Sequence, residues 1–482
     1  MNQSIENEMA LPYPAQSSSN KLVALWKDLR EAIRGSEQEF TEGSFSRAII
    51  LLAIPMVLEM VMESVFAVVD VFFVAKLGAD AVAAVGLTES IITLVYAVAM
   101  GLSMAATATV ARRIGEKDRQ GAVVTAVQVI AIGMIVSLPV TAIGLIFAPQ
   151  ILALMGASEN IIAIGSGYTT VMLAGNATIM LLFLINAIFR GAGNAAIAMR
   201  VLWIANAINI VLDPCLIFGL GPFPELGVAG AAVATNIGRG VGVLYQLHVL
   251  FRGQGRIQLD RAALKLSPPV MLQLLRVSLG GVFQILIATA SWVGLTRIVA
   301  MFGSAALAGY TIAIRIIVFS ILPSWGLSNA AATLVGQNLG AKKPERAEKS
   351  VWLTGFSNML FLIGVGLIFI LFAERLVAIF TSDPNVVPYA VECLRIVSYG
   401  YLFYAYGMVV VQAFNGAGDT YTPTLINLLC YWVVQIPLAY LLAIPLQVGA
   451  TGAFIAITVA ESLLAVVGIL VFRRGKWKEK QV

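Results

Sequence analysis

The sequence predicts an all-α membrane protein whose twelve transmembrane helices form two six-helix bundles. Composition is the first observation: 59% of the 482 residues are hydrophobic and only 12% are charged, against roughly 25% charged residues in a soluble domain. The apolar residues also form blocks of roughly 20 residues or more, which are long enough to cross a bilayer. Finally, several motifs of the first half recur in the second half at one constant offset, which predicts an internal repeat.

The apolar blocks give the expected spans in order along the chain. They cover residues 47–73, 81–109, 121–147, 161–188, 196–219, 227–251, 269–300, 305–333, 350–373, 387–414, 422–444 and 449–472. Lys and Arg gather in the loops after even-numbered spans and in the C-terminal tail, whereas the opposite loops hold little beyond Lys76 and Arg375. The positive-inside rule therefore places both termini in the cytoplasm. Because the net charge of +5 belongs to these loops, it does not indicate a nucleic-acid partner.

The internal repeat relates the two halves of the chain. The matching pairs are "GLSMAATATVARRIG" at Gly101 with "GLSNAAATLVGQNLG" at Gly326, "FRGAGNAAIAM" at Phe189 with "FNGAGDTYTPT" at Phe414, and, at a slightly shorter offset, "GVAGAA" at Gly227 with "GATGAF" at Gly449. Each half has six spans, an even number, so both halves enter the membrane from the same side as parallel repeats. Two such bundles predict a V-shaped, alternating-access arrangement with substrate bound between them.

These patterns also set the expected domain boundaries. We expect a cytoplasmic tail with an amphipathic helix (1–44), an N-lobe (45–251), an inter-lobe loop (252–268), a C-lobe (269–474) and a basic cytoplasmic tail (475–482). The helical spacing of apolar residues in "KLVALWKDLREAIRG" favours a helix on the membrane surface, with an ordinary solvated helix as the alternative. The N-terminal stretch "MNQSIENEMALPYPAQSSSN" lacks the pattern of a signal peptide, and we expect it to be disordered.

The first span carries three acids where an ionised side chain is costly. Glu59, Glu63 and Asp70 fall on one helical stripe. Each ionised acid at mid-membrane costs on the order of 3 kcal/mol, so these groups must face protein or water, find partners, or hold a proton. The repeat places Gln284 and Leu295 at the positions of Glu59 and Asp70 in the second half. The stripe therefore belongs to one half only, which favours an ion-coupling site in the N-lobe.

Polar groups on other spans are the expected partners of the stripe. Asn209 and Asp213 lie one turn apart in "ANAINIVLDPCLIF", and Thr235 and Arg239 lie one turn apart in "ATNIGRG". We expect Arg239 to neutralise Glu59, Glu63 or Asp213, and Tyr168 to donate to a carboxylate. The alternative is a static salt-bridge network that holds the lobe together.

Three further features are open to more than one interpretation. Pro55 lies one turn before the stripe and permits a kink, although prolines are also tolerated in spans without moving. The tyrosines of "SYGYLFYAYG", including Tyr404, suit promiscuous binding or simple helix packing. In the second half, Arg315 and Glu461 are expected to pair with each other.

The sequence favours a transporter over an enzyme. It contains no HExxH, nucleophile-elbow or Walker motif. The three cysteines lie in apolar segments and are expected to be reduced. Without an ATPase module, energy must come from an ion gradient, and no cofactor is expected besides the coupling ion, H⁺ or Na⁺.

The motifs together resemble a known family. "AIPMVLEMVMESVFAVVDVFFVAKLGADAVAAVGL", "FRGAGNAAIAM", "NIVLDP" and "GVAGAAVAT" are similar to the multidrug and toxic compound extrusion (MATE) family, nearest to its DinF-like bacterial branch, over residues 45–474. The resemblance implies export of cationic or amphipathic drugs in exchange for H⁺ or Na⁺ across the bacterial inner membrane. It implies a coupling site of Asp70, Asn209, Asp213 and Thr235, which would also hold Na⁺ if Na⁺ is the ion, with Tyr168 nearby.

The resemblance also implies a substrate cavity, and the sequence departs from the family pattern in two respects. The expected cavity residues are Glu59, Glu63, Asn186, Arg239, Gln284 and Tyr404. Ala288 and Tyr404 stand where other branches of the family have acids, and Glu63 stands where the family pattern has glutamine. The expected partners are small organic substrates and the lipid bilayer, with the protein acting as a monomer. A lipid-linked saccharide flippase and a channel are the alternatives.

Overall fold

A computed structural model describes residues 18–35, 40–252, 256–259 and 264–480. The first half comprises α1 (Ser18–Arg34), α2 (Phe45–Ala75), α3 (Ala79–Gly115), α4 (Arg119–Leu154), α5 (Glu159–Ala174), α6 (Asn176–Gly191), α7 (Ala195–Phe218) and α8 (Val228–Arg252). The second half comprises α9 (Pro268–Ala300), α10 (Ser304–Gly340), α11 (Pro344–Ala378), α12 (Val387–Tyr399), α13 (Tyr401–Gly416), α14 (Tyr421–Asn427), the π-helix η2 (Leu428–Gln435), α15 (Ile436–Ala443), α16 (Ala450–Arg473) and the short 3₁₀ helix η3 (Lys476–Glu479). The all-α prediction is confirmed, and each of the twelve expected spans coincides with one helix or one broken helix.

Length and hydropathy support most of these helices as membrane spans. Among the described residues, nine helices qualify, and eleven qualify if the bent pairs α5–α6 and α12–α13 each count as one span. The remaining expected span is α8, which buries the polar side chains of Thr235, Arg239 and Gln246 inside the bundle.

The backbone geometry repeats between the two halves. The bent pairs turn by 41° and 60°. The bends fall at Gly175 and Gly400, which are related by the same offset as Gly101 and Gly326. Lys117 and Lys342 share that offset too, and both have positive φ, at 61° and 57°. The repeat read from the sequence therefore extends to details of the backbone.

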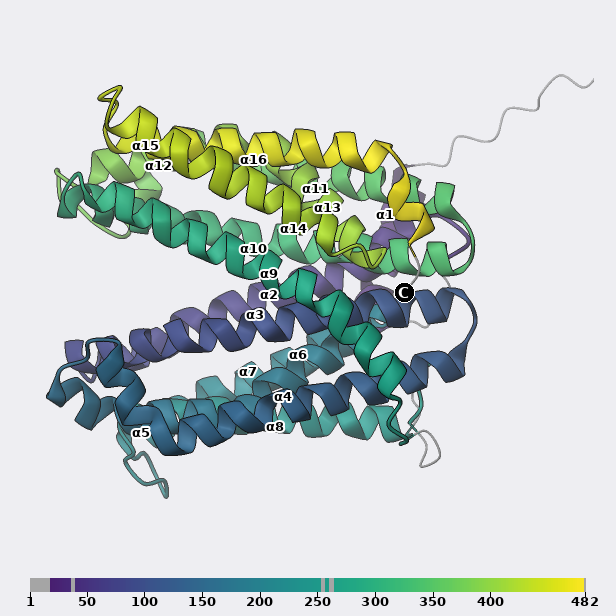
Figure 1. Cartoon of the computed structure of the whole chain (residues 1–482), viewed down its shortest axis with the longest axis horizontal. Coiled ribbons are helices and arrows are strands. Elements are labelled where there is room, and N and C mark those ends of the chain that lie inside the picture. The colour runs from purple at the N-terminus through teal and green to yellow at the C-terminus, as the bar shows by residue number, and fades with distance from the viewer. Residues whose placement is uncertain (1–17, 36–39, 253–255, 260–263, 481–482) are drawn as a thin grey trace, which may run out of the picture.

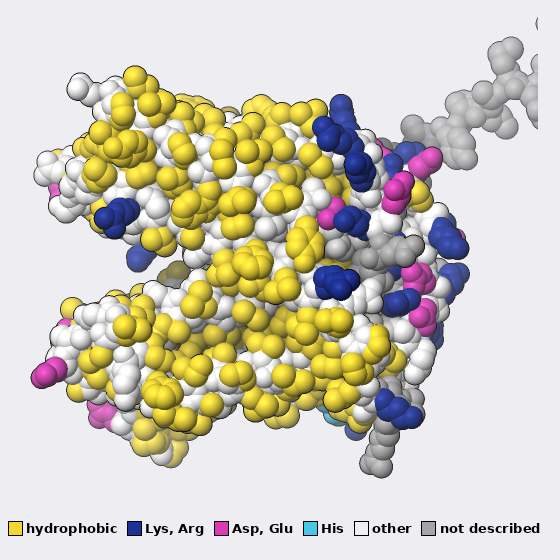
Figure 2. Space-filling model, viewed as in Figure 1, with side chains coloured by type: hydrophobic (Ala, Val, Ile, Leu, Met, Phe, Trp, Pro, Cys, Tyr) yellow, Lys and Arg dark blue, Asp and Glu magenta, His cyan; other side chains and the backbone are white. Residues whose placement is uncertain are grey.

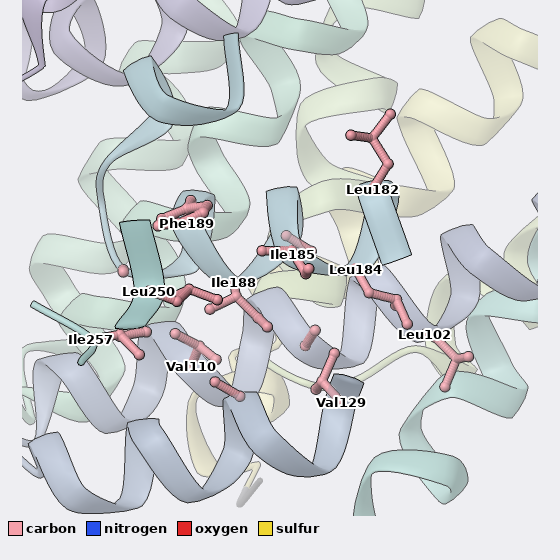
Figure 3. Close-up of a cluster of buried hydrophobic side chains, with 14 of the residues drawn as sticks. Leu102, Val110, Val129, Leu182, Leu184, Ile185, Ile188, Phe189, Leu250 and Ile257 are labelled. Atoms are coloured by element: carbon pink, nitrogen blue, oxygen red, sulfur yellow. The ribbon is translucent and has the colours of Figure 1, made fainter. Parts of the chain in front are cut away.

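The helices form two lobes that diverge from one end of the molecule. The N-lobe contains α2–α8 and the C-lobe contains α9–α16 (Figure 1). The lobes meet at the end that carries α1 and η3, here called the termini end, and separate toward the opposite end, where Figure 2 shows a cleft between them. Each lobe has its own core; in the N-lobe, apolar side chains from α3, α4, α6 and α8 interlock, including Leu102, Val129, Ile185 and Leu250 (Figure 3).

The second membrane span of each lobe packs on the first membrane span of the other lobe. On α3, a β-carbon at Gly101 would lie 2.6 Å from the backbone nitrogen of Val282 on α9. On α10, a β-carbon at Gly326 would lie 2.6 Å from the backbone oxygen of Met56 on α2. Because Gly101 and Gly326 are repeat equivalents, the two lobes are joined by a pseudo-symmetric pair of close helix crossings.

Polar contacts across the lobes reinforce the termini end. Thr333 Oγ1 on α10 donates to the backbone oxygen of Arg190 (3.2 Å), and Gln337 Nε2 donates to that of Gly191 (3.0 Å). Arg112 Nη2 on α3 donates to the backbone oxygen of Lys480 beyond η3 (2.5 Å). The C-terminal segment thus bridges to the N-lobe.

The expected amphipathic helix is present as α1. Its apolar residues Val23, Leu25 and Trp26 are exposed, at 69%, 50% and 69%, whereas Asp28 and Glu31 lie near Arg47 of α2. An exposed apolar face suits a membrane surface, and that location stays a prediction. The predicted disorder of residues 1–20 falls almost entirely outside the described residues. The three cysteines are free thiols.

Candidate functional site

The acid stripe of α2 points into the N-lobe, toward α6, α7 and α8. At its termini end, Glu59 Oε1 accepts hydrogen bonds from Arg190 Nη1 (3.0 Å) and Asn186 Nδ2 (3.3 Å). Gln246 Nε2 on α8 in turn donates to Asn186 Oδ1 (2.6 Å). Glu59 is therefore anchored in a buried network that connects three helices.

The cation that neutralises Glu59 is Arg190, not Arg239. The Arg190 side chain is 12% exposed and that of Glu59 is 3% exposed. Arg239 was one expected partner of Glu59, but its Nη2 atom lies 3.9 Å from Glu63 instead. Arg190 was not among the expected partners of Glu59. An arginine within an apolar helix was the available signal.

We expect Glu59→Ala to lower the free energy of unfolding by about 3–5 kcal/mol, because it leaves the Arg190 guanidinium buried without its carboxylate. Denaturant unfolding in detergent micelles measures the change. The control is Glu374→Ala, which breaks an ion pair with Arg395 whose side chains are 73% and 37% exposed; we expect a loss below about 1 kcal/mol there. Equal losses in the two variants would contradict a buried, structural pair.

Glu63 occupies the middle of the stripe. Its Oε2 atom accepts a hydrogen bond from Asn206 (3.2 Å) and its Oε1 atom faces Arg239. The Arg239 guanidinium also lies over the rings of Phe66 and Tyr96, at 5.7 and 5.8 Å from their centroids. At 3.9 Å the ion pair is loose, and the Glu63 side chain stays 26% exposed, so this carboxylate remains available to another group.

Asp70 and Asp213 lie together at the other end of the stripe. Each carboxyl is buried, and they are close enough to interact electrostatically. Asn209 Nδ2 donates to Asp213 Oδ1 (3.3 Å) and to Thr235 Oγ1 (3.0 Å). Tyr168 lies within electrostatic range of Asp70. The five residues expected at the coupling site are therefore brought into one cluster from α2, α5, α7 and α8.

Some acceptor oxygens of this cluster lack hydrogen-bond or ion-pair partners among the described residues. Among the described residues, neither Asp70 nor Asp213 forms an ion pair with Lys or Arg. In the part of the chain that the structure describes, no donor reaches Asp213 Oδ2 or Asn209 Oδ1, which are both buried. Buried oxygens of this kind are normally satisfied, and two neighbouring acids without a salt bridge suit a proton or a small hard cation. The residues present thus fit the coupling ion that the sequence suggested.

A cavity of about 250 Å³ lies between the lobes. Its lining comprises Met60, Glu63, Met100, Ser103, Met104, Thr107, Phe183 and Arg190 from the N-lobe, and Leu322, Trp325, Asn329, Ala332, Gln412 and Asn415 from the C-lobe. The wall is mostly apolar, with three methionines, and its charged side chains are Glu63 and Arg190. Methionine and aromatic side chains adapt to ligands of different shapes.

The six expected cavity residues do not line one common cavity. Glu63 lines the inter-lobe cavity, and Tyr404 lines a separate small cavity within the C-lobe. Neither cavity is lined by the other four, Glu59, Asn186, Arg239 and Gln284, all of which are buried. Their expected contact with substrate stays a prediction. Pro55 is buried within a continuous α2 helix, and bending at this residue likewise stays a prediction.

The chain has two lobes built from one repeated unit, a cavity between the lobes and a cluster of membrane-embedded acids. Together these features define a multi-pass membrane transporter. The family model described as MatE matches residues 55–215 and again residues 282–441, one match in each lobe. Together the matches cover more than half of the chain, which belongs to the MATE family of multidrug efflux transporters, integral to bacterial membranes.

Named relatives are similar over nearly the whole chain. The probable multidrug resistance protein NorM of Thermotoga maritima is 29% identical over 436 residues, which is 90% of this chain and 94% of the relative. The multidrug export protein MepA of Staphylococcus aureus is 23% identical over 437 residues, 90% and 94% of the two chains. A protein of Shewanella oneidensis named FAD transporter is 25% identical over 400 residues, 82% and 87% of the two chains.

Solved structures confirm the architecture. A crystal structure of MATE in the straight conformation matches with a TM-score of 0.86 and 27% identity, over 92% of this chain and 99% of that one. A crystal structure of MATE in the bent conformation gives a TM-score of 0.84 and 26% identity, over 92% and 97%. An outward-facing multidrug resistance MATE transporter gives 0.85 and 27%, over 92% and 98%.

Proposed function

We propose that the protein exports cationic, amphipathic organic compounds in exchange for H⁺ or Na⁺, and that Asp70 and Asp213 bind the coupling ion. The observation that carries the proposal is their cluster in the N-lobe, where two buried carboxyls lie within electrostatic range of each other and, among the described residues, neither forms a salt bridge with Lys or Arg. Binding of a positive ion relieves their mutual repulsion, so the ion has a differential affinity for the arrangement that brings them together. No other cofactor is required by this scheme.

The proposed substrate binds in the inter-lobe cavity. Its apolar wall accepts hydrophobic rings and chains, and Glu63 supplies a partly exposed negative charge for a cationic group. Because both sides of the cavity come from one chain, a monomer is sufficient. The name of the Shewanella relative points to an anionic substrate for that protein; here Arg190, already neutralised by Glu59, is the cavity's only arginine among the described lining residues.

The proposed orientation places the termini end in the cytoplasm. Lys and Arg side chains concentrate at this end of the molecule (Figure 2), as the positive-inside rule requires of a cytoplasmic face. The cleft then opens to the outside. Export requires the lobes to rock about their close crossings, so that the cavity faces the two sides in turn.

The test is substrate efflux from proteoliposomes under imposed gradients. We expect the purified protein to move an organic cation uphill when a pH gradient or a Na⁺ gradient is applied, and not when both are absent. The gradient that supports transport identifies the ion. A channel dissipates a substrate gradient but never builds one, so downhill-only movement would reject the proposal.

We expect Glu63→Gln to weaken apparent affinity for a monocationic substrate about tenfold, equivalent to about 1.4 kcal/mol, while an uncharged substrate is transported normally. The change removes the cavity carboxylate but keeps its size and its hydrogen bond from Asn206. Concentration-dependent efflux of a matched charged and neutral pair measures this. Glu392→Gln, remote from the cavity and bonded to Thr451, is the control. Complete loss of transport of both substrates in folded protein would instead make Glu63 part of the coupling machinery.

A further inference from the structure

The centre of the C-lobe contains a buried carboxyl of its own, that of Glu461 on α16. Glu461 is 8% exposed, and its Oε1 atom accepts a hydrogen bond from the Tyr431 hydroxyl of η2 (3.2 Å). The expected partner, Arg315, lies exposed on α10, and no Lys or Arg forms an ion pair with Glu461 within the described ranges. The prediction of an Arg315–Glu461 pair is therefore wrong, and this carboxyl has a tyrosine where a cation was expected.

A small cavity lies against this carboxyl. Its lining comprises Trp292, Leu295, Tyr310, Ile314, Ile317, Ile321, Val397, Tyr404, Gln435, Ile457 and Glu461. The space open to the centres of water-sized molecules is about 20 Å³, which is enough for roughly one water molecule and too small for an organic substrate. Ile321 of this cavity directly precedes Leu322, which lines the inter-lobe cavity, so the two spaces approach each other along α10.

The segment that faces Glu461 is wound as a π-helix. Tyr431 and Gln435 both lie in η2 (Leu428–Gln435), and Gln435 Oε1 accepts a hydrogen bond from Ser291 on α9 (2.8 Å). The π-helical turn is rare and is frequently found at functional sites. The corresponding span of the N-lobe, α7, is a regular α-helix. The C-lobe therefore has a local distortion, absent from α7, at the point where its buried acid is held.

The repeat gives Glu461 a counterpart in the N-lobe. With the offset that relates Gly227 to Gly449, Glu461 takes the position of Arg239. Arg239 is buried beside a carboxylate, Glu63. Glu461 is buried at the equivalent place, and no cation pairs with it among the described residues. An uncompensated ionised acid in a membrane interior is expensive, and such groups typically mark proton or ion pathways.

We propose that Glu461 is a second proton-exchange site, located in the C-lobe and distinct from the Asp70–Asp213 cluster. The Glu461 carboxyl transfers one proton to water in the adjoining cavity, which gives hydronium and a carboxylate that accepts the Tyr431 hydrogen bond. The carboxylate takes one proton back from hydronium in the same cavity. The titratable groups around it are Tyr404 from α13, Tyr431 and Cys430 from η2, and Tyr310 from α10, which lines the same cavity. The described residues of the packed elements present no charged group to it. Its exchange is a property of the folded protein, and only its contribution to transport rests on the proposed function.

Infrared difference spectroscopy of the reconstituted full chain tests the exchange directly. We expect a carboxylic-acid carbonyl band to appear on going from mildly alkaline to mildly acidic pH, to shift on carbon-isotope labelling of glutamate, and to be absent from Glu461→Gln. It should persist in Asp70→Asn and in the control Glu392→Gln. In Tyr431→Phe the band should move in frequency, because the hydrogen-bond donor is removed. A glutamate band that is unchanged in Glu461→Gln, or wild-type spectra without any pH-sensitive glutamate band, would overturn the proposal.

Transport measurements keep this proposal separate from the N-lobe mechanism. In vesicles that report proton flux and substrate flux together, we expect Glu461→Gln to retain gradient-driven export but to exchange fewer protons per substrate than wild type. An unchanged ratio, together with an unchanged infrared band, rejects Glu461. Failure of Asp70→Asn to affect export would reject the proposed coupling site and leave the infrared result on Glu461 standing.

Discussion

Asp70→Asn is expected to reduce gradient-driven export to the level of vesicles without protein. Asparagine has nearly the size of aspartate but cannot take up a proton or offer a full negative charge to a cation. Asp70 lies within electrostatic range of the buried Asp213 carboxyl. Within the described ranges, the Oδ2 atom of Asp213 has no hydrogen-bond donor. Without the charge of Asp70, the cluster no longer binds the coupling ion more tightly in one arrangement of the lobes than in the other. The ion gradient then no longer shifts the equilibrium between the two arrangements.

The measurement is uphill efflux of an organic cation from proteoliposomes under a pH or Na⁺ gradient. Asp383→Asn is the matched control and should transport normally. Asp383 lies in the loop before α12, and its carboxylate accepts a hydrogen bond from the backbone nitrogen of Asn385. Asp213→Asn should have an effect similar to Asp70→Asn, and the double variant should lose little more, because residues acting as one unit are not additive. Normal uphill transport by folded Asp70→Asn would remove Asp70 from the mechanism.

The fold was predictable because its determinants are periodic in the chain. Apolar block length gives the spans, and the constant offset between repeated motifs gives the two lobes. The same offset relates Gly175 to Gly400, where both bends occur. The bends themselves were not predicted, since each interrupts an apolar block without changing its composition. A single glycine within such a block is compatible with a straight helix as well as with a broken one.

The coupling cluster was predictable for a related reason. Helical spacing put Asn209 and Asp213 on one face, and the cost of burying Asp70 required polar neighbours. Spacing within a helix does not say which helices face each other. Arg190 lies 131 residues from Glu59 along the chain, so their pairing depends on the packing of α2 against α6. The Glu461 cavity was not predicted for the same reason, and because a π-helical turn has no distinct residue pattern.

The second large effect is expected where α3 and α10 cross at the termini end. Gly115 and Gly340 are repeat equivalents, related by the same offset as Gly101 and Gly326. A β-carbon at Gly115 would lie 2.0 Å from the backbone oxygen of Gln337, and one at Gly340 would lie 2.1 Å from that of Arg112. Real side chains do not tolerate such distances to backbone, so any larger residue forces the two helices apart. The contact that closes the lobes at this end then cannot form.

We expect Gly340→Val and Gly115→Val to fold, because each lobe has its own hydrophobic core, but to lose the state in which the cleft is open opposite the termini. Transport requires both states, so export should fall at least tenfold. Alkylation of a cysteine introduced at Asn329, which lines the inter-lobe cavity, reports the state in a background lacking the three native cysteines. With the variants, the thiol should become less reactive from the outside and more reactive from the cytoplasmic side.

Gly86→Val is the matched control for this prediction. Gly86 lies on the same helix as Gly115, and a β-carbon there would meet no atom within 4 Å. The control should keep wild-type labelling and export, since it adds the same bulk to α3 without touching the opposite lobe. If the Gly340→Val and Gly115→Val proteins label and transport like the Gly86→Val protein, the lobes do not close through this crossing. Equal effects of Gly115→Val and Gly340→Val would indicate that both lobes contribute equally to closure at the α3–α10 crossing, as their pseudo-symmetric contacts require.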